Sequence, residues 1–161
     1  MSMLSSAFAL CVLAATAVPA DPKAGAPVDA APLKIGSILI LTGEGSAWGT
    51  ASRHGIDMAV RQLNSEGGVL GKRVVAVHQD DQGDPKKSIS AFRYLVDVED
   101  VRFIIGPNWS ALGIPLIEMA DRAKVIMISP SLGMARFNES SPFLFNTWPH
   151  DFVLSQKLAE Y

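Results

Sequence analysis

Two turns rich in hydroxyl and small residues hold the groups best suited to chemistry in this sequence. They are Gly106-Pro107-Asn108-Trp109-Ser110 and Ser129-Pro130-Ser131-Leu132-Gly133, which follow the aliphatic runs Val101 to Ile105 and Val125 to Ile128. Such runs are typical of buried strands in a parallel sheet. Because the carboxyl ends of parallel strands meet at one edge, both turns would offer hydroxyl and N–H donors to one crevice. Donors gathered in this way suit the binding of a small polar ligand.

A metal site is the first alternative, because three carboxylates lie close together in the sequence at Asp80, Asp81 and Asp84. Their order, Asp-Asp-Gln-Gly-Asp, lacks the alternating ligand spacing of a calcium loop and has no distal glutamate in register. We therefore interpret Asp84 as the N-cap of a helix with Pro85 at its first position. Asp80 and Asp81 are expected to accept hydrogen bonds from turn backbone, and no metal site is predicted.

Nucleophilic catalysis has little support in the pattern of histidines and serines. His54, His78 and His150 have no second histidine at helical spacing and no neighbouring cysteine, so we interpret them as surface or strand-edge residues. Ser110 and Ser131 lack the G-x-S-x-G elbow that exposes a nucleophile. No catalytic residue is predicted.

Dinucleotide binding is a further alternative, because Gly43, Gly45 and Gly49 lie between an expected strand and an expected helix. Their spacing is G-x-G-x-x-x-G, whereas the dinucleotide fingerprint is G-x-G-x-x-G. The N-terminal apolar run, Ala7 to Val18, also argues against dinucleotide binding. It is interpreted below as part of a signal peptide for export, and reduced nicotinamide cofactors are scarce outside the cytoplasm. No cofactor is predicted, and a Rossmann-type enzyme is kept only as a minor alternative.

The elements that would position the two turns alternate regularly between strands and helices. Strands are expected at Leu33 to Leu41, Val74 to His78, Arg102 to Ile105, Val125 to Ile128 and Phe143 to Asn146. Helices of ten to fifteen residues between strands imply right-handed crossovers. The sequence therefore predicts the α/β class, as a doubly wound parallel sheet with helices on both faces.

Two of the expected helices are defined in more detail by their residue patterns. In the first, an apolar stripe at helical spacing is formed by Ile56, Ala59, Val60 and Leu63, and the opposite face holds Arg53, Asp57 and Arg61, which can pair. Gly67 and Gly68 end this helix. The helix after the third strand is expected from Ser110 to Ala123, with Ser110 as its N-cap.

Composition is that of one globular domain, since the 161 residues are 48% hydrophobic and 19% charged. The net charge of −2, from 14 Lys and Arg and 16 Asp and Glu, gives no electrostatic footprint for nucleic acid. We therefore expect no nucleic-acid partner.

The first twenty residues are interpreted as a signal peptide, residues 1–20. Ala7 to Val18 is an apolar run too short to span a bilayer, and it ends in the cleavage pattern Val18-Pro19-Ala20. The only cysteine, Cys11, lies within this run, so the mature chain would have no disulfide. Residues 21–32, rich in Ala, Pro and Gly, are interpreted as a linker before one domain at residues 33–161.

Three segments resemble a known family. They are IGSILILTGEGSAWGTASRHGIDMAVRQLNSEGGVLGKRV, DDQGDPKKSISAFRYLV and FIIGPNWSALGIPLIEMADRAKVIMISPS. In this order they resemble the N-terminal lobe of the type I periplasmic binding proteins of branched-chain amino acid ABC transporters, over Leu33 to Tyr161. The resemblance implies strand order 2-1-3-4-5, a second lobe that this chain lacks, and a ligand held between the lobes as a hinge closes.

The resemblance also implies roles for individual residues. The hydroxyl and N–H of Ser110 would hold a ligand carboxylate, and the turn from Ser131 to Gly133 would complete the grip and offer a carbonyl to an ammonium. Trp48 would be one wall of the cleft and Trp109 the other, with core packing as the alternative for both. Amino-acid binders of the family commonly have threonine where this chain has Gly133, which favours recognition of a carboxylate or amide over an α-amino acid.

The function implied by the resemblance is therefore binding without catalysis. The protein would be a periplasmic monomer that delivers a small amino acid, carboxylate or amide to an ABC permease in the inner membrane. A ligand-sensing receptor domain built on the same lobe is the main alternative.

Overall fold

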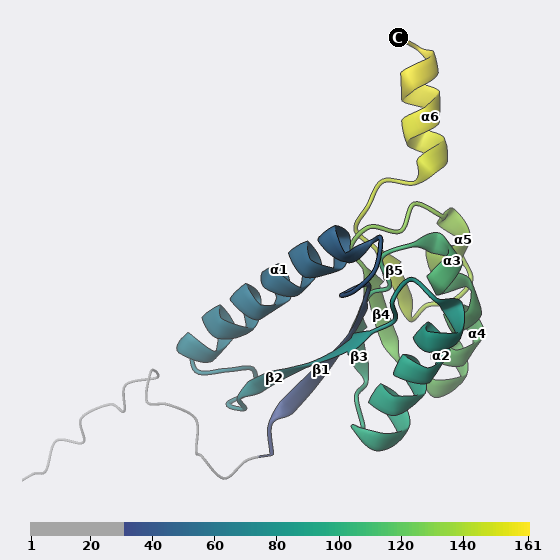
Figure 1. The fold of residues 1–161 in the computed structure, drawn as a ribbon. Helices are drawn as coiled ribbons and strands as arrows, with labels where there is room; N and C mark the ends of the chain where they lie inside the picture. Colours follow the sequence, from purple (N-terminus) through teal and green to yellow (C-terminus); the bar gives the residue numbers. More distant parts are fainter. Residues whose placement is uncertain (1–30) are drawn as a thin grey trace, which may run out of the picture.

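Five parallel strands form the central sheet of the computed structural model, which describes residues 31–161 (Figure 1). They are β1 Leu33–Leu39, β2 Val74–Asp80, β3 Phe103–Ile105, β4 Ile126–Ser129 and β5 Leu144–Asn146. The order across the sheet is β2-β1-β3-β4-β5. This arrangement confirms the predicted fold class and strand order, with strand ends shifted by one or two residues. The expected signal peptide and residues 21–30 of the expected linker lie outside the described residues.

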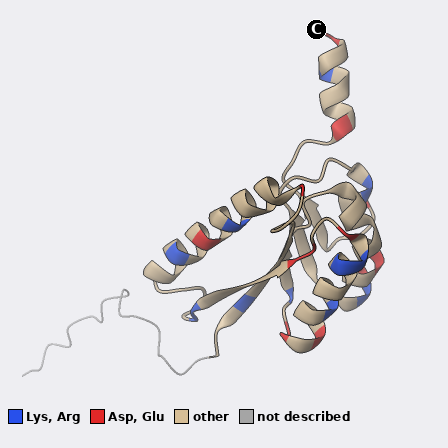
Figure 2. Cartoon of the chain, in the orientation of Figure 1, with Lys and Arg blue, Asp and Glu red and all other residues tan. Residues whose placement is uncertain are grey.

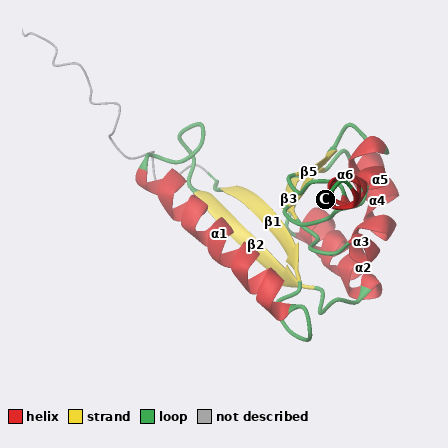
Figure 3. Cartoon of the chain, turned by 90° about the horizontal axis from the view of Figure 1, so that it is seen from above, coloured by secondary structure: helices red, strands yellow, loops and turns green. Residues whose placement is uncertain are grey.

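Helices cover both faces of the sheet unequally. The α-helices are α1 Ser46–Ser65, α2 Pro85–Arg93, α3 Ser110–Gly113, α4 Ile117–Ala123, α5 Ala135–Glu139 and α6 Asp151–Ala159. Figures 1 and 3 show α1 alone on one face and α2 to α5 on the other, while α6 projects away from the sheet with its residues exposed. Within residues 31–161, none of the helices has the length and hydropathy needed to cross a bilayer.

The hydrophobic core lies between the sheet and the helices α2 to α5. It joins strand residues such as Ile38 and Met127 to helix residues such as Leu95, Leu116 and Phe137, and all five are fully buried. A short π-helical segment at Tyr94–Val98 continues α2 and contributes Leu95 to this core. The carboxyl ends of β3 and β4, which carry the two predicted turns, are therefore supported from one side by a packed core.

The apolar stripe predicted for α1 is buried only in part. Ile56 is buried and Val60 is half-buried, but Ala59 is exposed and Leu63 is 36% exposed. The reason is that part of the sheet face beside Leu63 is not covered by α1, which leaves an apolar groove of about 310 Å³. The groove is lined by residues that include Leu33, Leu63, Val69, Val74, Phe103 and Ile126.

Polar contacts therefore contribute to the attachment of α1 to the sheet. The Asn64 side chain donates to the backbone oxygen of Val74 at 2.9 Å and accepts from its N–H at 2.8 Å. Arg53 and Asp57 pair across one helical turn at 3.7 Å, as predicted, and Figure 2 shows the alternating charges along the exposed side of α1. Helix α1 ends before Gly67 and Gly68, also as predicted.

His78 takes part in a network that the sequence analysis missed. Its Nδ1 lies 2.7 Å from Ser37 Oγ, and its Nε2 lies 2.9 Å from Asp57 Oδ1. The hydrogen bond to His78 is the largest cause of the lowered pKa of Asp57. Ser37, His78 and Asp57 form a chain of hydrogen bonds with the residue types of a catalytic triad. Ser37 is only 1% exposed within β1, however, so its hydroxyl cannot reach a substrate. The three side chains link α1 to β1 and β2.

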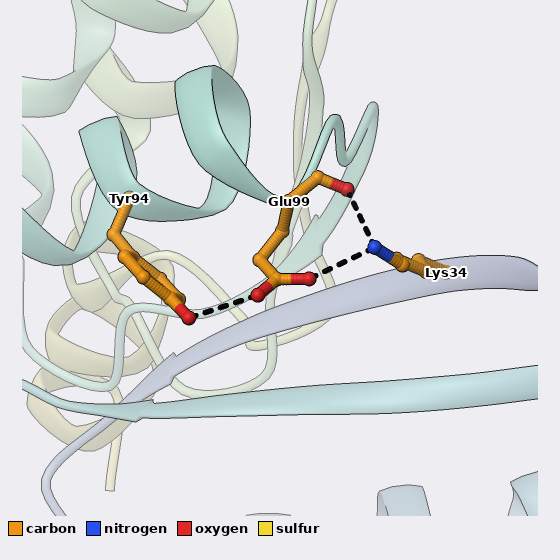
Figure 4. A network of polar contacts seen from close by, with 3 residues as sticks. All are labelled: Lys34, Tyr94 and Glu99. Atoms are coloured by element: carbon orange, nitrogen blue, oxygen red, sulfur yellow. Dashed lines mark hydrogen bonds and ion pairs between the residues drawn. The ribbon is translucent and has the colours of Figure 1, made fainter.

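A second polar network lies at the amino end of the sheet, far along β1 from the predicted turns (Figure 4). Lys34 Nζ donates to Glu99 Oε2 at 2.9 Å and to the backbone oxygen of Glu99 at 3.3 Å, and the Tyr94 hydroxyl donates to Glu99 Oε1 at 2.8 Å. The hydrogen bond from Lys34, followed by that from Tyr94, lowers the pKa of Glu99. This network joins the start of β1 to the chain that leads into β3.

The helix predicted from Ser110 to Ala123 is broken into three parts. Helix α3 ends at Gly113, a 3₁₀ turn covers Ile114–Leu116, and α4 begins at Ile117. Pro115 explains the break, because it has no N–H to donate to the preceding turn and its ring crowds that turn's carbonyl. The prediction of one continuous helix is therefore wrong, although the backbone remains helical throughout.

Candidate functional site

Asn108 holds together three loops at the carboxyl edge of the sheet. Its side chain is fully buried, its Oδ1 accepts from the N–H of Ile40 at 3.3 Å, and its Nδ2 donates to Ser52 Oγ at 3.0 Å and Ser131 Oγ at 3.3 Å. Ser131 Oγ in turn donates to the backbone oxygen of Asn108 at 2.9 Å. The end of β1, the start of α1 and the two predicted turns therefore lie side by side, as the sequence analysis expected of the turns.

Ser129 forms a second tie between the same two turns. Its buried hydroxyl donates to the backbone oxygen of Pro107 at 2.8 Å and accepts from the N–H of Leu132 at 3.0 Å. The turn after β4 is thus fixed by a hydroxyl at its first position, which leaves Ser131 free to bond to Asn108.

Ser110 is the first residue of α3 and is not its N-cap, which corrects the prediction. Trp109 occupies the N-cap position in extended backbone conformation, and no side chain caps the helix. The carbonyl of Trp109 accepts from the N–H groups of Leu112 and Gly113 at 3.0 and 3.2 Å. Within the part of the chain that the structure describes, the Ser110 hydroxyl and the N–H groups of Ser110 and Ala111 have no hydrogen-bond partner, so they are available to an external acceptor.

A hollow of about 330 Å³ lies at this edge of the sheet. It is lined by Ala47, Trp48, Ala51, Ser52, Pro130, Ser131 and Trp148. Of the five predicted site residues, Trp48 and Ser131 line this hollow, whereas Ser110, Gly133 and Trp109 do not. Ser52 and Ser131 both contact Asn108. Trp148, from the chain after β5, is a lining residue that the sequence analysis did not single out.

Trp109 lies elsewhere, among the loops after β1 and β2. A Cβ atom on Gly45 would lie 2.7 Å from its Cζ2, and one on Gly83 would lie 3.7 Å from its Cζ3. The ring is partly exposed, but it does not line the hollow that contains Trp48. Trp109 therefore fits the packing alternative better than the role of a second wall to that hollow.

Gly133 leaves room for a carboxylate that the sequence analysis did not anticipate. A Cβ atom at this position would lie only 1.8 Å from Asp151 Oδ1, and the N–H of Asp151 donates to the Gly133 oxygen at 2.9 Å. The start of α6 is thereby attached to the turn after β4. Compared with the threonine that amino-acid binders of the family commonly have at this position, Gly133 has no hydroxyl to offer a ligand. Its lack of a side chain makes room for the Asp151 carboxylate beside the same turn.

The three carboxylates at the end of β2 and in the loop after it accept hydrogen bonds from backbone and hydroxyl donors, which confirms their structural interpretation. Asp84 Oδ1 accepts from the N–H of Lys86 at 2.7 Å as an N-cap, with Pro85 following it. Buried Asp81 accepts from the N–H of Gly83 at 3.0 Å and the hydroxyl of Ser88 at 3.1 Å. Desolvation by burial is the main cause that raises the pKa of Asp81.

Asp80 supports the loop after β1 from the neighbouring strand. Its Oδ1 accepts from the N–H groups of Leu41, Thr42 and Gln82 at 2.9, 3.3 and 2.9 Å, and its Oδ2 accepts from the Thr42 hydroxyl at 2.6 Å. Desolvation, the largest single effect on this carboxyl, raises its pKa, but the hydrogen bonds together lower it below the ordinary value of 3.8.

Asp80→Asn is expected to make the chain less sensitive to acid. A carboxyl with a depressed folded pKa stabilises the fold above its unfolded pKa, and this stabilisation is lost as the pH falls through the folded pKa. The variant should therefore be less stable than the parent near neutral pH, with a difference that shrinks below about pH 4. Urea unfolding at several pH values measures this, with exposed Asp97→Asn as the control. A difference independent of pH would contradict the assignment.

Comparison with known proteins identifies the family. The sequence profile described as "Periplasmic binding protein" matches residues 32–161. This chain belongs to the periplasmic binding protein family. That family consists of substrate-binding proteins rather than enzymes, and the resemblance found in the sequence is confirmed.

Individual relatives of this periplasmic binding protein support the same assignment. It is 37% identical to the Leu/Ile/Val-binding protein BraC3 of Rhizobium johnstonii, over 66% of the chain and 29% of that protein. It is 32% identical to the chemotactic signal transduction system substrate-binding protein BasB of Halobacterium salinarum, over 80% of the chain and 33% of that protein. The chain therefore spans about a third of the length of these curated relatives.

A solved structure supports the fold of this periplasmic binding protein. The substrate-binding protein LivJ of Streptococcus pneumoniae, in complex with isoleucine, matches 75% of the chain with a TM-score of 0.72 and 29% identity. The match covers 35% of the LivJ chain. None of these relatives supports the dinucleotide-dependent enzyme that the glycine pattern left open.

Proposed function

We propose that this chain is the N-terminal lobe of an extracytoplasmic substrate-binding protein. It binds a small amino acid, or a related carboxylate or amide, for an ABC permease. The observation that carries the proposal is the group of donors without partners on Ser110 and Ala111, close to the Asn108 contact that joins the two turns. Backbone N–H and hydroxyl donors at the start of a helical segment suit a carboxylate.

The remaining candidate residues have distinct roles in this proposal. Ser110 holds the ligand carboxylate, the turn from Ser131 to Gly133 completes the grip, and Trp48 contacts the ligand side group. The carboxylate of Asp151, beside Gly133, offers a partner for an ammonium group where the side chain of residue 133 is missing. This contact supports amino acids as ligands more than the sequence alone did.

The names of the relatives support the ligand class, and the name of the family supports the location. BraC3 is named for leucine, isoleucine and valine, and LivJ was solved with isoleucine. A protein of this family is expected outside the cytoplasm. A signal peptide at residues 1–20 would direct the chain there. Sensing is the second candidate, because BasB is named for a chemotactic signal transduction system.

A titration of the 161-residue chain tests the proposal directly. Heteronuclear NMR spectra of isotope-labelled protein would be followed as leucine, isoleucine, benzoate or acetamide is added. We expect the amide signals of Ser110, Ala111 and Ser131 to move together, with weak affinity because one lobe makes only part of the contacts. If none of these amides moves with any of the four compounds at tens of millimolar, the proposed function is wrong for this chain.

Ser110→Ala is expected to weaken binding by about 1.5–3 kcal/mol, which is the usual contribution of a hydrogen bond to a charged group. This loss corresponds to a roughly 10- to 150-fold higher Kd. The same NMR titration measures the change, and Ser90→Ala, on the exposed side of α2, is the matched control. Unchanged affinity in Ser110→Ala would show that the Ser110 hydroxyl does not bind the ligand.

A further inference from the structure

Two tryptophans from distant parts of the chain meet at the hollow. Trp48 lies in the first turn of α1, and Trp148 lies between β5 and α6. Their ring centroids are 6.5 Å apart and their planes are inclined by 79°, which is an edge-to-face contact. Trp48 is 51% exposed and Trp148 is 41% exposed, so this pair presents an indole surface that the described chain does not cover.

The backbone around Trp148 is held to the sheet rather than free. The N–H of Thr147 donates to the Ser129 oxygen at 3.0 Å, and the N–H of Trp148 donates to Asn146 Oδ1 at 3.2 Å. The position of Trp148 is therefore set by the carboxyl ends of β4 and β5, the same edge that holds Ser131. These contacts hold the backbone that carries the indole beside Trp48.

The lining of the hollow has no charged side chain. It consists of the two indoles, Pro130, two alanines and two serines. A charged group that entered this space would lose hydration without gaining an ionic partner, whereas an aliphatic or aromatic group would lose only unfavourable contact with water. The lining therefore distinguishes ligands by the polarity of their side groups.

We propose that Trp148 is a specificity-determining residue of the binding site. With Trp48 it forms an aromatic corner that selects ligands with an uncharged aliphatic or aromatic side group and disfavours those with a charged one. This inference rests on the proposed function, because the aromatic corner selects among side groups only if the same ligand is held by its carboxylate at Ser110 and the neighbouring turn.

The chain contains three tryptophans, so its NMR spectrum has three indole N–H signals that single Trp→Phe variants assign. Leucine, phenylalanine, glutamate and lysine share the same α-amino acid group and differ only in the side group, which makes them matched probes. We expect leucine and phenylalanine to shift the indole signals of Trp48 and Trp148 at concentrations at least about tenfold lower than glutamate and lysine. The signal of Trp109, which lies outside the hollow, should move least.

Trp148→Ala tests the role of this residue itself. The ratio of the Kd for glutamate to the Kd for leucine should fall by about tenfold in Trp148→Ala and stay near the parent value in Trp148→Phe. Phe152→Ala, which removes an exposed aromatic residue in α6, is the control. The amide spectrum of each variant shows whether the fold is kept.

Two different failures are distinguishable in this experiment. If leucine shifts the amides of Ser110 and Ala111 but neither indole, or if Trp148→Ala leaves the ratio unchanged, the aromatic corner is overturned while the proposed function stands. If no amino acid shifts either group of signals, the role of Trp148 is wrong, and if benzoate and acetamide also shift neither group, the proposed function is wrong with it.

Discussion

Gly49→Ala is expected to destabilise the chain by about 3 kcal/mol, at the upper end of the usual cost of overpacking. A Cβ atom at this position would lie 1.9 Å from the oxygen and 2.4 Å from the carbonyl carbon of Ile40. Both atoms belong to the backbone just after β1, so no side-chain rotation relieves the clash. The start of α1 would have to move away from the sheet and would take Trp48 with it. Urea unfolding monitored by circular dichroism measures the loss.

Gly55→Ala is the matched control, because it makes the same change six residues further along the same helix. No heavy atom lies within 4 Å of the Cβ that it would add. Alanine has the better helix propensity, so this variant should gain about 0.5–1 kcal/mol. Equal effects of the two substitutions would show that helix propensity, and not the approach of α1 to Ile40, governs position 49.

Much of the fold could be predicted from the sequence, because local patterns determine it. The alternation of aliphatic runs with amphipathic segments fixes a parallel α/β sheet, and Asp84 followed by Pro85 marks a helix start by its own chemistry. The prediction of α1 burial was weaker, since Leu63 has the right spacing but remains 36% exposed beside an open apolar groove. Periodicity identifies the face of a helix that can be buried, and tertiary contacts decide how much of that face is buried.

The candidate site was less accessible to sequence reasoning, since it depends on contacts between distant residues. The two turns could be predicted to meet, because parallel strands place their carboxyl ends together. Nothing local indicates that Asn108 bonds to Ser52, that Trp148 packs against Trp48, or that Asp151 fills the space beside Gly133. The polar residue Asn108, three positions after the last residue of β3, was the one available signal that a buried contact was needed.

Asn108→Ala should cost about 3 kcal/mol, because each of three side-chain hydrogen bonds contributes about 1 kcal/mol. The substitution leaves the N–H of Ile40 without its acceptor and removes the donor to Ser52 and Ser131. The turn after β4 would then lose one of the three side-chain hydrogen bonds that join it to the turn after β3 and keep the two that end on backbone oxygens. Binding should therefore weaken together with stability, although Asn108 is fully buried and cannot itself touch a ligand.

Two further variants separate these effects. Asn138→Ala removes a half-buried asparagine whose side chain, within residues 31–161, makes one hydrogen bond, to His150 at 3.0 Å, so it should cost about 1 kcal/mol or less. Ser131→Ala removes one partner of Asn108 and keeps the Ile40 and Ser52 contacts, so its effect on binding should exceed its effect on stability. Urea unfolding and NMR titration with leucine on the same samples give both quantities. If Asn108→Ala is no more destabilising than Asn138→Ala, Asn108 does not organise the edge on which the donors of Ser110 depend.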